Sequence, residues 1–239
     1  EEAAVVSAVV PAATVCAVTP YAFPAVESPD TTQTAAEPPW ILFVAGFAHP
    51  PNGIAATWFV QEVLPAILAR VPAARVAIVG SNPPESVRHL CSTHVSLFAD
   101  VTDAALLAWY RRATVAVVPL LTGAGVKLKT VEALWHGVPA VLTPAGAQGL
   151  PGIERVVAVA TEPAALAAAV VDLLTDSALR QQRREAQMDY ARGRFSAAAQ
   201  TQSLLSALAL IGLRPDRRSL PADRVEQAAE GCVSHLAMA

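Results

Sequence analysis

The residue types best suited to chemistry gather between positions 120 and 136. This stretch follows a run of strand type and opens on Gly123 and Gly125. The chain has 17 basic residues, and only two of them are lysines, Lys127 and Lys129, both in this stretch. A glycine-rich turn that leads into a helix, with cationic side chains beside it, suits an anionic ligand.

The spacing within this stretch predicts a polar face on a helix. If the helix starts near Gly125, then Gly125, Lys129, Glu132 and His136 lie on one stripe. A nucleoside diphosphate fits this stripe: backbone N–H groups at 123–126 and a lysine would meet the phosphates, and Glu132 would accept hydrogen bonds from ribose hydroxyls. The alternative is a solvated helix face, on which Lys129 and Glu132 form an ordinary surface pair.

Two common phosphate-binding motifs are excluded by a single position. A P-loop needs glycine directly before Lys129-Thr130, and a dinucleotide fingerprint needs a third glycine; both requirements fail at Leu128. Any anion site here therefore belongs to another class.

The elements around this stretch predict an α/β fold. Apolar strands are expected at 41–45, 75–79, 95–98, 114–119, 138–142 and 155–159, and helices at 53–70, 85–90, 103–112, 125–136, 163–174, 178–192 and 197–213. The alternation is typical of a Rossmann-like, doubly wound parallel sheet, which binds ligands beyond the carboxyl ends of its strands. The small-residue loop 143–149 is expected beside the glycine-rich loop, because successive strands are often neighbours.

The rest of the chain suggests three regions. Residues 1–39 hold two short runs of β type, at 4–6 and 15–18, and a polar linker from 22 to 39; residues 40–196 form the α/β domain; residues 197–239 form a helix and a frayed tail with a short helix at 223–230. The chain starts at Glu1 rather than Met, which suggests a fragment. The apolar run at 3–17 is too short and too broken to span a membrane.

The composition of the chain argues against one class of partner and indicates a cellular compartment. The net charge of −3 gives no global field that attracts nucleic acid. Three cysteines far apart indicate a reducing, cytoplasmic compartment rather than a disulfide framework.

From Phe43 onward the sequence resembles the C-terminal, donor-binding half of GT-B glycosyltransferases of family 4, or group 1. The matching motifs are Gly46-Phe-Ala-His-Pro-Pro-Asn52, Val76-Ala-Ile-Val-Gly80, Trp109-Tyr-Arg-Arg-Ala113, Gly123-Ala-Gly-Val-Lys-Leu-Lys-Thr-Val-Glu-Ala133, His136-Gly-Val-Pro139, Thr143-Pro-Ala-Gly-Ala-Gln-Gly149 and Arg194-Phe-Ser196. The resemblance implies one half of a GT-B fold followed by C-terminal helices. It also implies retaining, metal-independent transfer of a sugar from a nucleoside diphosphate sugar, with no cofactor.

The resemblance assigns the expected donor-binding residues: Gly46, Asn52, Gly123, Gly125, Lys127, Lys129 and Glu132. Glu132 corresponds to the second glutamate of the family's Glu-x7-Glu motif, which holds the ribose. The first glutamate, which usually contacts the sugar, falls at Ala124, and the usual basic pair after the first strand is absent, with Asn52 near the lysine position. The two lysines would then take over the phosphate role, and no catalytic residue is assigned.

A GT-B enzyme needs a second domain that binds the acceptor, and this sequence holds at most a remnant of it. The chain alone is therefore expected to be inactive. The expected place of work is the cytoplasm, with a peripheral contact at the inner face of the membrane as the minority interpretation. Two alternatives stay open: a degenerate module that binds a nucleotide sugar without turnover, and one half of a two-domain sugar-nucleotide epimerase.

Four histidines have other candidate roles. His49 lies in a loop after a strand, where ligands bind, but packing is the favoured role. His89, Cys91 and His94 have a spacing that could bind metal, but no fourth ligand is near in sequence. His136 is expected to interact with the end of its helix.

Overall fold

The centre of the molecule is one parallel sheet of six strands. The computed structural model describes residues 2–19, 21–24 and 38–213, and the strands follow the order β3-β2-β1-β4-β5-β6. They are β1 (Trp40–Val44), β2 (Arg75–Gly80), β3 (Val95–Ala99), β4 (Val115–Val118), β5 (Ala140–Leu142) and β6 (Ala158–Val159). Every strand that the sequence predicts within residues 40–196 is present, and all pairs are parallel. The prediction of a doubly wound α/β fold is confirmed.

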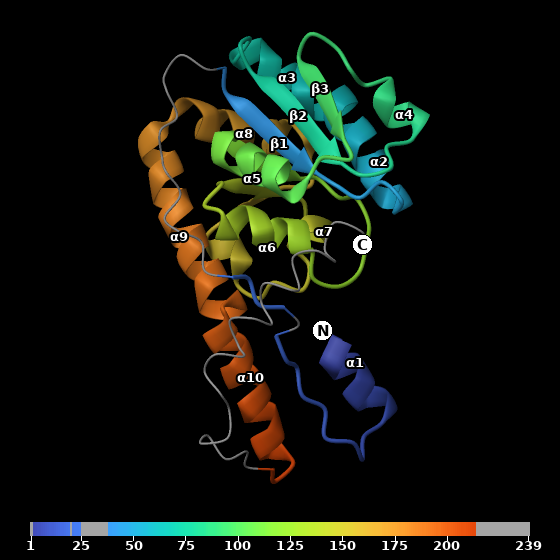
Figure 1. The fold of residues 1–239 in the computed structure, drawn as a ribbon, viewed down its shortest axis with the longest axis vertical. Coiled ribbons are helices and arrows are strands. Elements are labelled where there is room, and N and C mark those ends of the chain that lie inside the picture. The colour runs from blue at the N-terminus through green and yellow to red at the C-terminus, as the bar shows by residue number, and fades with distance from the viewer. Residues whose placement is uncertain (1, 20, 25–37, 214–239) are drawn as a thin grey trace.

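Helices cover both faces of this sheet (Figure 1). They are α2 (Pro50–Trp58), α3 (Leu64–Arg70), α4 (Glu85–Arg88), α5 (Asp103–Arg112), α6 (Leu128–Trp135), α7 (Pro144–Ala147), α8 (Pro163–Thr175), α9 (Ser177–Phe195) and α10 (Ala197–Leu210). On one face α3 packs on α8, and on the other face α5 and α6 pack on the strands while α9 packs on α6. The inner residues of β1, β2, β4 and β5 are apolar because both faces of the sheet are covered there, whereas the edge strand β3 is only partly buried.

The boundaries of several elements differ from the sequence prediction. The helix expected at 53–70 begins at Pro50 and contains a π-helical turn, Phe59–Val63, between α2 and α3. The strand expected at 155–159 is shortened by a 3₁₀ turn, Ile153–Arg155. The loop expected at 143–149 contains the short helix α7, which Thr143 caps by accepting a hydrogen bond from the N–H of Gly146.

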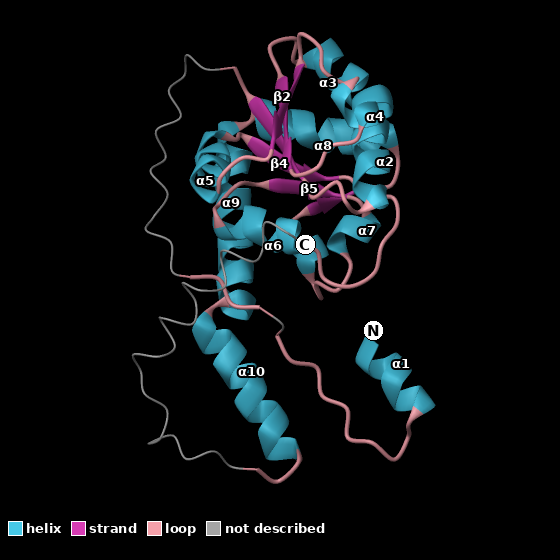
Figure 2. Cartoon of the chain, turned by 45° about the vertical axis from the view of Figure 1, so that its right-hand side comes forward, coloured by secondary structure: helices cyan, strands magenta, loops and turns pink. Residues whose placement is uncertain are grey.

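The N-terminal segment does not form strands. The run at 4–6 lies in α1 (Glu2–Val9), and the run at 15–18 has no regular structure, because neither run has a partner strand. Figures 1 and 2 show α1 apart from the sheet and α10 projecting away from it. Most of the linker predicted at 22–39, the tail predicted at 214–239 and its short helix lie outside the described residues.

Residues 16–19 lie beside α10, and residues 21–24 reach the start of α10 and α6. The N–H of Thr19 donates to Ser203 Oγ (2.9 Å), and the N–H of Phe23 donates to the carbonyl oxygen of Phe195 (2.8 Å). Trp135 of α6 donates its Nε1–H to the carbonyl oxygen of Pro24 (3.0 Å), and its ring lies 5.5 Å from that of Phe23. These contacts tie the two ends of the described chain to the helix that carries the candidate site.

A buried glutamine attaches α9 to the sheet. Gln187 is 1% exposed; its Oε1 accepts from the N–H of Ala140 (2.9 Å), and its Nε2 donates to the carbonyl oxygen of Val156 (3.0 Å). Replacing Gln187 with methionine leaves both backbone groups buried without this partner. We expect a loss of about 2 kcal/mol in the free energy of unfolding, measured by urea denaturation.

The matched control is Gln181→Met on the same helix. Gln181 is exposed and bonds only to Glu185 (2.6 Å) among the described contacts, so the same substitution should change the free energy of unfolding by less than about 0.5 kcal/mol. Equal stability of the two variants would contradict the anchoring role of Gln187.

Candidate functional site

The candidate site lies where the strand order reverses, between β1 and β4. In an open parallel sheet, the loops that follow the two strands at this point diverge and leave a crevice for a ligand. The loop 45–49 follows β1, and the loop 119–127 follows β4. Both carry residues that the sequence singles out.

Asn52 joins these two sides. It lies in the first turn of α2 and is 5% exposed. Its Nδ2 donates to the carbonyl oxygen of Gly46 (2.6 Å), and its Oδ1 accepts from Nζ of Lys129 (2.6 Å). The structure thus brings together three of the predicted site residues, Gly46, Asn52 and Lys129, which are up to 83 residues apart in sequence.

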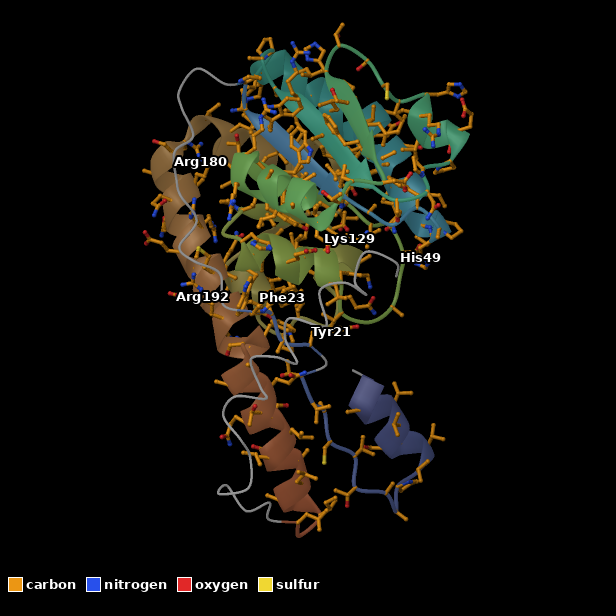
Figure 3. The ribbon with its side chains drawn as sticks, in the orientation of Figure 1. Tyr21, Phe23, His49, Lys129, Arg180 and Arg192 are labelled. Atoms are coloured by element: carbon orange, nitrogen blue, oxygen red, sulfur yellow. The ribbon has the colours of Figure 1, made fainter. Side chains whose placement is uncertain are left out.

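The ammonium group of Lys129 is held in a poorly solvated place. Burial, and in second place the charge of Lys127, lower the pKa of Lys129 to about 8. At pH 7 the group therefore remains protonated, but its charge is only partly compensated because its described partner, Asn52, is neutral. A bound anion would supply the missing countercharge. Figure 3 shows Lys129 near the start of α6, beside the carboxyl ends of the strands.

Lys127 shapes the glycine-rich loop. Its Nζ donates to the carbonyl oxygens of Ala124 (2.8 Å) and Gly125 (2.8 Å). Gly123 and Gly125 have positive φ angles, 145° and 72°, that side chains rarely allow. Lys127, Gly123 and Gly125 therefore form a second group of predicted site residues, a folded loop next to the start of α6.

The start of the central helix was predicted wrongly. Helix α6 begins at Leu128 rather than near Gly125, with Lys127 in an extended conformation as the residue before it. The positive φ of Gly125 is incompatible with a right-handed helix, so the loop continues for three more residues. The stripe survives without its first member: Lys129, Glu132 and His136 still follow the helical spacing.

Glu132 does not pair with Lys129; its described hydrogen-bond partner is a buried tyrosine. The hydroxyl of Tyr110, on α5, donates to Oε2 of Glu132 (3.0 Å), and Tyr110 is 2% exposed. The ring of His136 stacks on Tyr110 with 4.9 Å between ring centroids. Glu132 and Lys129 are both half-buried, so the solvated helix face is wrong.

Burial sets the protonation of this cluster. Desolvation raises the pKa of Glu132; the hydrogen bond from Tyr110 lowers it, and the charge of Asp103 adds to the rise. Burial, followed by the charge of Arg111, lowers the pKa of His136 to about 4. His136 is therefore neutral at pH 7, and it directly follows the last residue of α6, at the helix end where the sequence predicts it.

The loop 143–149 lies beside the glycine-rich loop, as the sequence predicts. A side chain at Gly149 would come within 3.1 Å of the backbone nitrogen of Val126. Thr130 of α6 donates its hydroxyl to the carbonyl oxygen of Gly146 (3.0 Å), and Thr143 donates to the carbonyl oxygen of Leu120. The two loops therefore support each other.

The remaining candidate histidines, His49, His89 and His94, take no part in this cluster. His49 is exposed at the start of α2, and its side chain does not cap that helix. His89 pairs with Glu85 (3.0 Å), and His94 Nδ1 contacts the carbonyl oxygen of Ala74 (3.1 Å). Among residues 2–19, 21–24 and 38–213, no three metal-ligating side chains come together.

The sequence did not single out Tyr110 for a role. Its signal is weak: a tyrosine on a helix face that is otherwise apolar needs a partner for its hydroxyl when it is buried. Only the packing of α5 against α6 shows that the partner is Glu132.

Known proteins show the same architecture. Sucrose-phosphate synthase from Thermosynechococcus elongatus matches 83% of this chain with a TM-score of 0.58 and 20% identity, and an α,α-trehalose-phosphate synthase (UDP-forming) from Burkholderia vietnamiensis matches 74% with a TM-score of 0.58 and 14% identity. The described sheet is thus the Rossmann-like half of a GT-B glycosyltransferase fold. The chain belongs to the family Glycosyl transferases group 1, whose profile matches residues 38–176.

This chain spans a third to a half of its relatives. It covers 52% and 46% of the two synthases. A 44.6 kDa protein in the cps region of Klebsiella pneumoniae is 28% identical over 116 residues, which are 46% of this chain and 30% of that protein. No helix in the described ranges has the length and apolar character needed to cross a membrane.

Proposed function

We propose that this chain is the donor-binding part of a glycosyltransferase that moves a sugar from a nucleoside diphosphate sugar to an acceptor. The hydrogen bond from Lys129 to Asn52 carries this proposal, because it sets a partly desolvated cation at the switch point of the sheet. A trehalose-6-phosphate protein from E. coli with the same fold (TM-score 0.57, 17% identity) has been crystallised with UDP-2-fluoro glucose.

The position of the cation supports a diphosphate ligand. The sequence lacks the basic pair that the family usually has after its first strand. Lys129 reaches that place from the opposite side of the crevice and bonds to the side chain of Asn52, which stands near the missing lysine. Lys129 of α6 would therefore replace the missing basic pair near α2. Its ammonium group would neutralise the diphosphate and stabilise the charge that develops on the diphosphate as the sugar leaves.

The sugar end of the site would rely on backbone groups. Ala124 stands where the family usually has a glutamate, and it lies exposed in the loop folded by Lys127. We expect this loop to contact the sugar through main-chain groups, while Glu132 contacts the ribose. Transfer with retention of configuration, without metal or cofactor, is the mechanism that the family resemblance favours, with the diphosphate assisting deprotonation of the acceptor.

A second domain would complete the enzyme. Among the described residues, most of the large apolar side chains with high exposure lie on two segments outside the α/β body: Val5, Val6, Val9, Val10, Val18, Leu204, Leu210, Ile211 and Leu213. Exposed apolar side chains gathered on a segment in this way are typical of a contact with another domain. We propose that these segments contact the acceptor domain. We also propose that the whole protein works in the cytoplasm, and that it contacts the inner face of the membrane if its acceptor is bound to the membrane.

One observation favours the alternative of a binding module without turnover. Ala124 cannot contact a sugar as a glutamate does, and its carbonyl oxygen is already bonded to Lys127. Such a module would bind the nucleotide part of the donor with the same residues and would lack transfer even beside an acceptor domain.

Calorimetric titration of this chain with UDP, GDP and ADP tests the proposal. We expect measurable binding of one of the three, and a loss of at least tenfold in affinity in Glu132→Ala, because the ribose loses its carboxylate acceptor. Glu154→Ala is the control, since Glu154 is an exposed carboxylate on the 3₁₀ turn 153–155. Absence of binding to all three nucleotides would overturn the proposed donor function, and equal affinity of both variants would overturn the site.

A further inference from the structure

Tyr110 occupies an unusual position between the site and the core. It lies near the end of α5, 22 residues before Glu132, and its side chain is buried while that of Glu132 is half-buried. A buried hydroxyl needs a partner, and this one donates to a carboxylate rather than to the backbone. A hydrogen bond to a charged acceptor is stronger and more directional than a neutral one.

The hydrogen bond leaves the two oxygens of Glu132 in different situations. Oε2 accepts from Tyr110, whereas none of the side-chain hydrogen bonds or ion pairs described within residues 2–19, 21–24 and 38–213 involves Oε1. Tyr110 itself is held on its flat side by the ring of His136, and both residues belong to elements packed on the sheet. The carboxylate therefore has a fixed orientation before any ligand arrives.

We propose that Tyr110 is a positioning residue whose hydroxyl holds Oε2 of Glu132 so that Oε1 is presented to the ribose of the donor. This inference rests on the proposed function for its ligand. It replaces the expected bidentate contact of a free Glu132 carboxylate by a contact made mainly through one oxygen. It also explains why a tyrosine hydroxyl is buried beneath the polar stripe of α6.

The surroundings of Glu132 and the hydroxyl of Tyr110 act in opposite directions on the pKa of the Glu132 carboxyl. Desolvation and the carboxylate of Asp103, on the first turn of α5, both raise the pKa of Glu132, and only the hydrogen bond from Tyr110 lowers it. Along α6, Lys129 lies one turn before Glu132 and bonds to Asn52, and His136 lies one turn after it with its pKa lowered to about 4. Removing the hydroxyl should therefore shift the titration of Glu132 to higher pH.

The test compares Tyr110→Phe with Tyr190→Phe. Tyr190 is also buried, and its hydroxyl donates to the carbonyl oxygen of Pro151 (3.1 Å) away from the site, so it controls for the loss of a buried hydroxyl. Using the nucleoside diphosphate that binds best, we expect Tyr110→Phe to weaken binding about tenfold and Tyr190→Phe to weaken it less than twofold.

Two further arms separate positioning from general damage. With the 2′,3′-dideoxy form of the same nucleotide, Tyr110→Phe should bind as the unaltered chain does, because the contact through Oε1 is missing in both. In a Glu132→Ala background, Tyr110→Phe should have no additional effect. An equal loss for the ribose and dideoxyribose forms, or an additive loss in the double variant, would overturn the proposal.

A measurement without nucleotide judges the hydrogen bond independently of the proposed function. The ¹³C resonance of the Glu132 side-chain carboxyl should titrate at higher pH in Tyr110→Phe than in the unaltered chain and in Tyr190→Phe. In the unaltered chain, the chemical shift of the Tyr110 hydroxyl proton should change over the same pH range as the Glu132 carboxyl resonance. This measurement does not depend on whether a variant folds. Unchanged titration would overturn the positioning role, whereas failure of every nucleotide to bind, with the titration shifted, would overturn the proposed donor function alone.

Discussion

Replacing Lys129 with methionine should weaken the binding of a nucleoside diphosphate about 100-fold. The reason is that Lys129 places its ammonium group in the crevice through Asn52, and no other described lysine does so, since Lys127 bonds to the carbonyl oxygens of its own loop. A charge-assisted contact with phosphate in a partly desolvated site contributes more than an exposed one. Calorimetric titration measures the loss directly.

The control for a general effect of charge is Arg88→Met. Arg88 is exposed on α4, and its replacement changes the net charge by the same amount. We expect an affinity within twofold of that of the unaltered chain. If Arg88→Met and Lys129→Met lost affinity equally, the crevice would have no special role.

The pH dependence of binding provides a second measurement on Lys129. Binding requires the protonated amine, whose pKa is lowered to about 8, so affinity should be constant below about pH 7 and fall above pH 8, by up to about tenfold per pH unit. Lys129→Arg keeps its charge over this range, and its affinity should therefore stay level up to pH 9.5. A decline of the same size in Lys129→Arg would assign the alkaline limb to another group.

Replacing Gly80 with alanine should destabilise the fold by about 3 kcal/mol. An ideal Cβ at this position would lie 1.7 Å from the carbonyl oxygen of Ala45, so the backbone after β1 or the end of β2 must move. The neighbouring contacts resist such a movement, because the N–H of Ala45 bonds to the carbonyl oxygen of Val79 (3.0 Å) and that of Phe47 to Ser81 (2.9 Å). The free energy of unfolding in urea measures the effect.

Gly193→Ala is the matched substitution. Gly193 is exposed near the end of α9 with nothing within 4 Å of an added Cβ, so alanine should raise stability by up to about 1 kcal/mol through its better helix propensity. Opposite signs for the two glycines are the expected result. A cost below about 0.5 kcal/mol at Gly80 would mean that β1 and β2 separate easily at their carboxyl ends.

Local sequence was sufficient for most of the sheet. The strands from β1 to β5 are short, mostly apolar runs, and burial of the inner residues of β1, β2, β4 and β5 makes that pattern clear. Prediction from local sequence failed where an apolar run has no neighbouring strand to pair with. Val5 and Val6 have strand propensity, but no strand among the described residues pairs with them, and they form part of α1.

The sequence singled out residues of the candidate site that the structure brings together, but it did not predict the contacts between them. The chemistry of Lys129 and Glu132 was readable from their helical spacing, whereas the partners of both come from other elements: Asn52 from α2 and Tyr110 from α5. The contacts of Lys127 could not be predicted either, since a lysine two or three residues after Ala124 and Gly125 can fold back on their carbonyl groups. Spacing cannot distinguish that arrangement from a side chain that faces a ligand.

The concentration of both lysines in one place has a consequence for amine-directed chemistry. An acylating, carbamylating or crosslinking reagent that is specific for lysine side chains can modify only Lys127 and Lys129 in this sequence. The lowered pKa of Lys129 leaves a larger share of it unprotonated, and thus nucleophilic, than an ordinary lysine has at neutral pH. Covalent labelling would therefore report on occupancy of the crevice without any engineered handle, and lysine acetylation would be a means of switching it off.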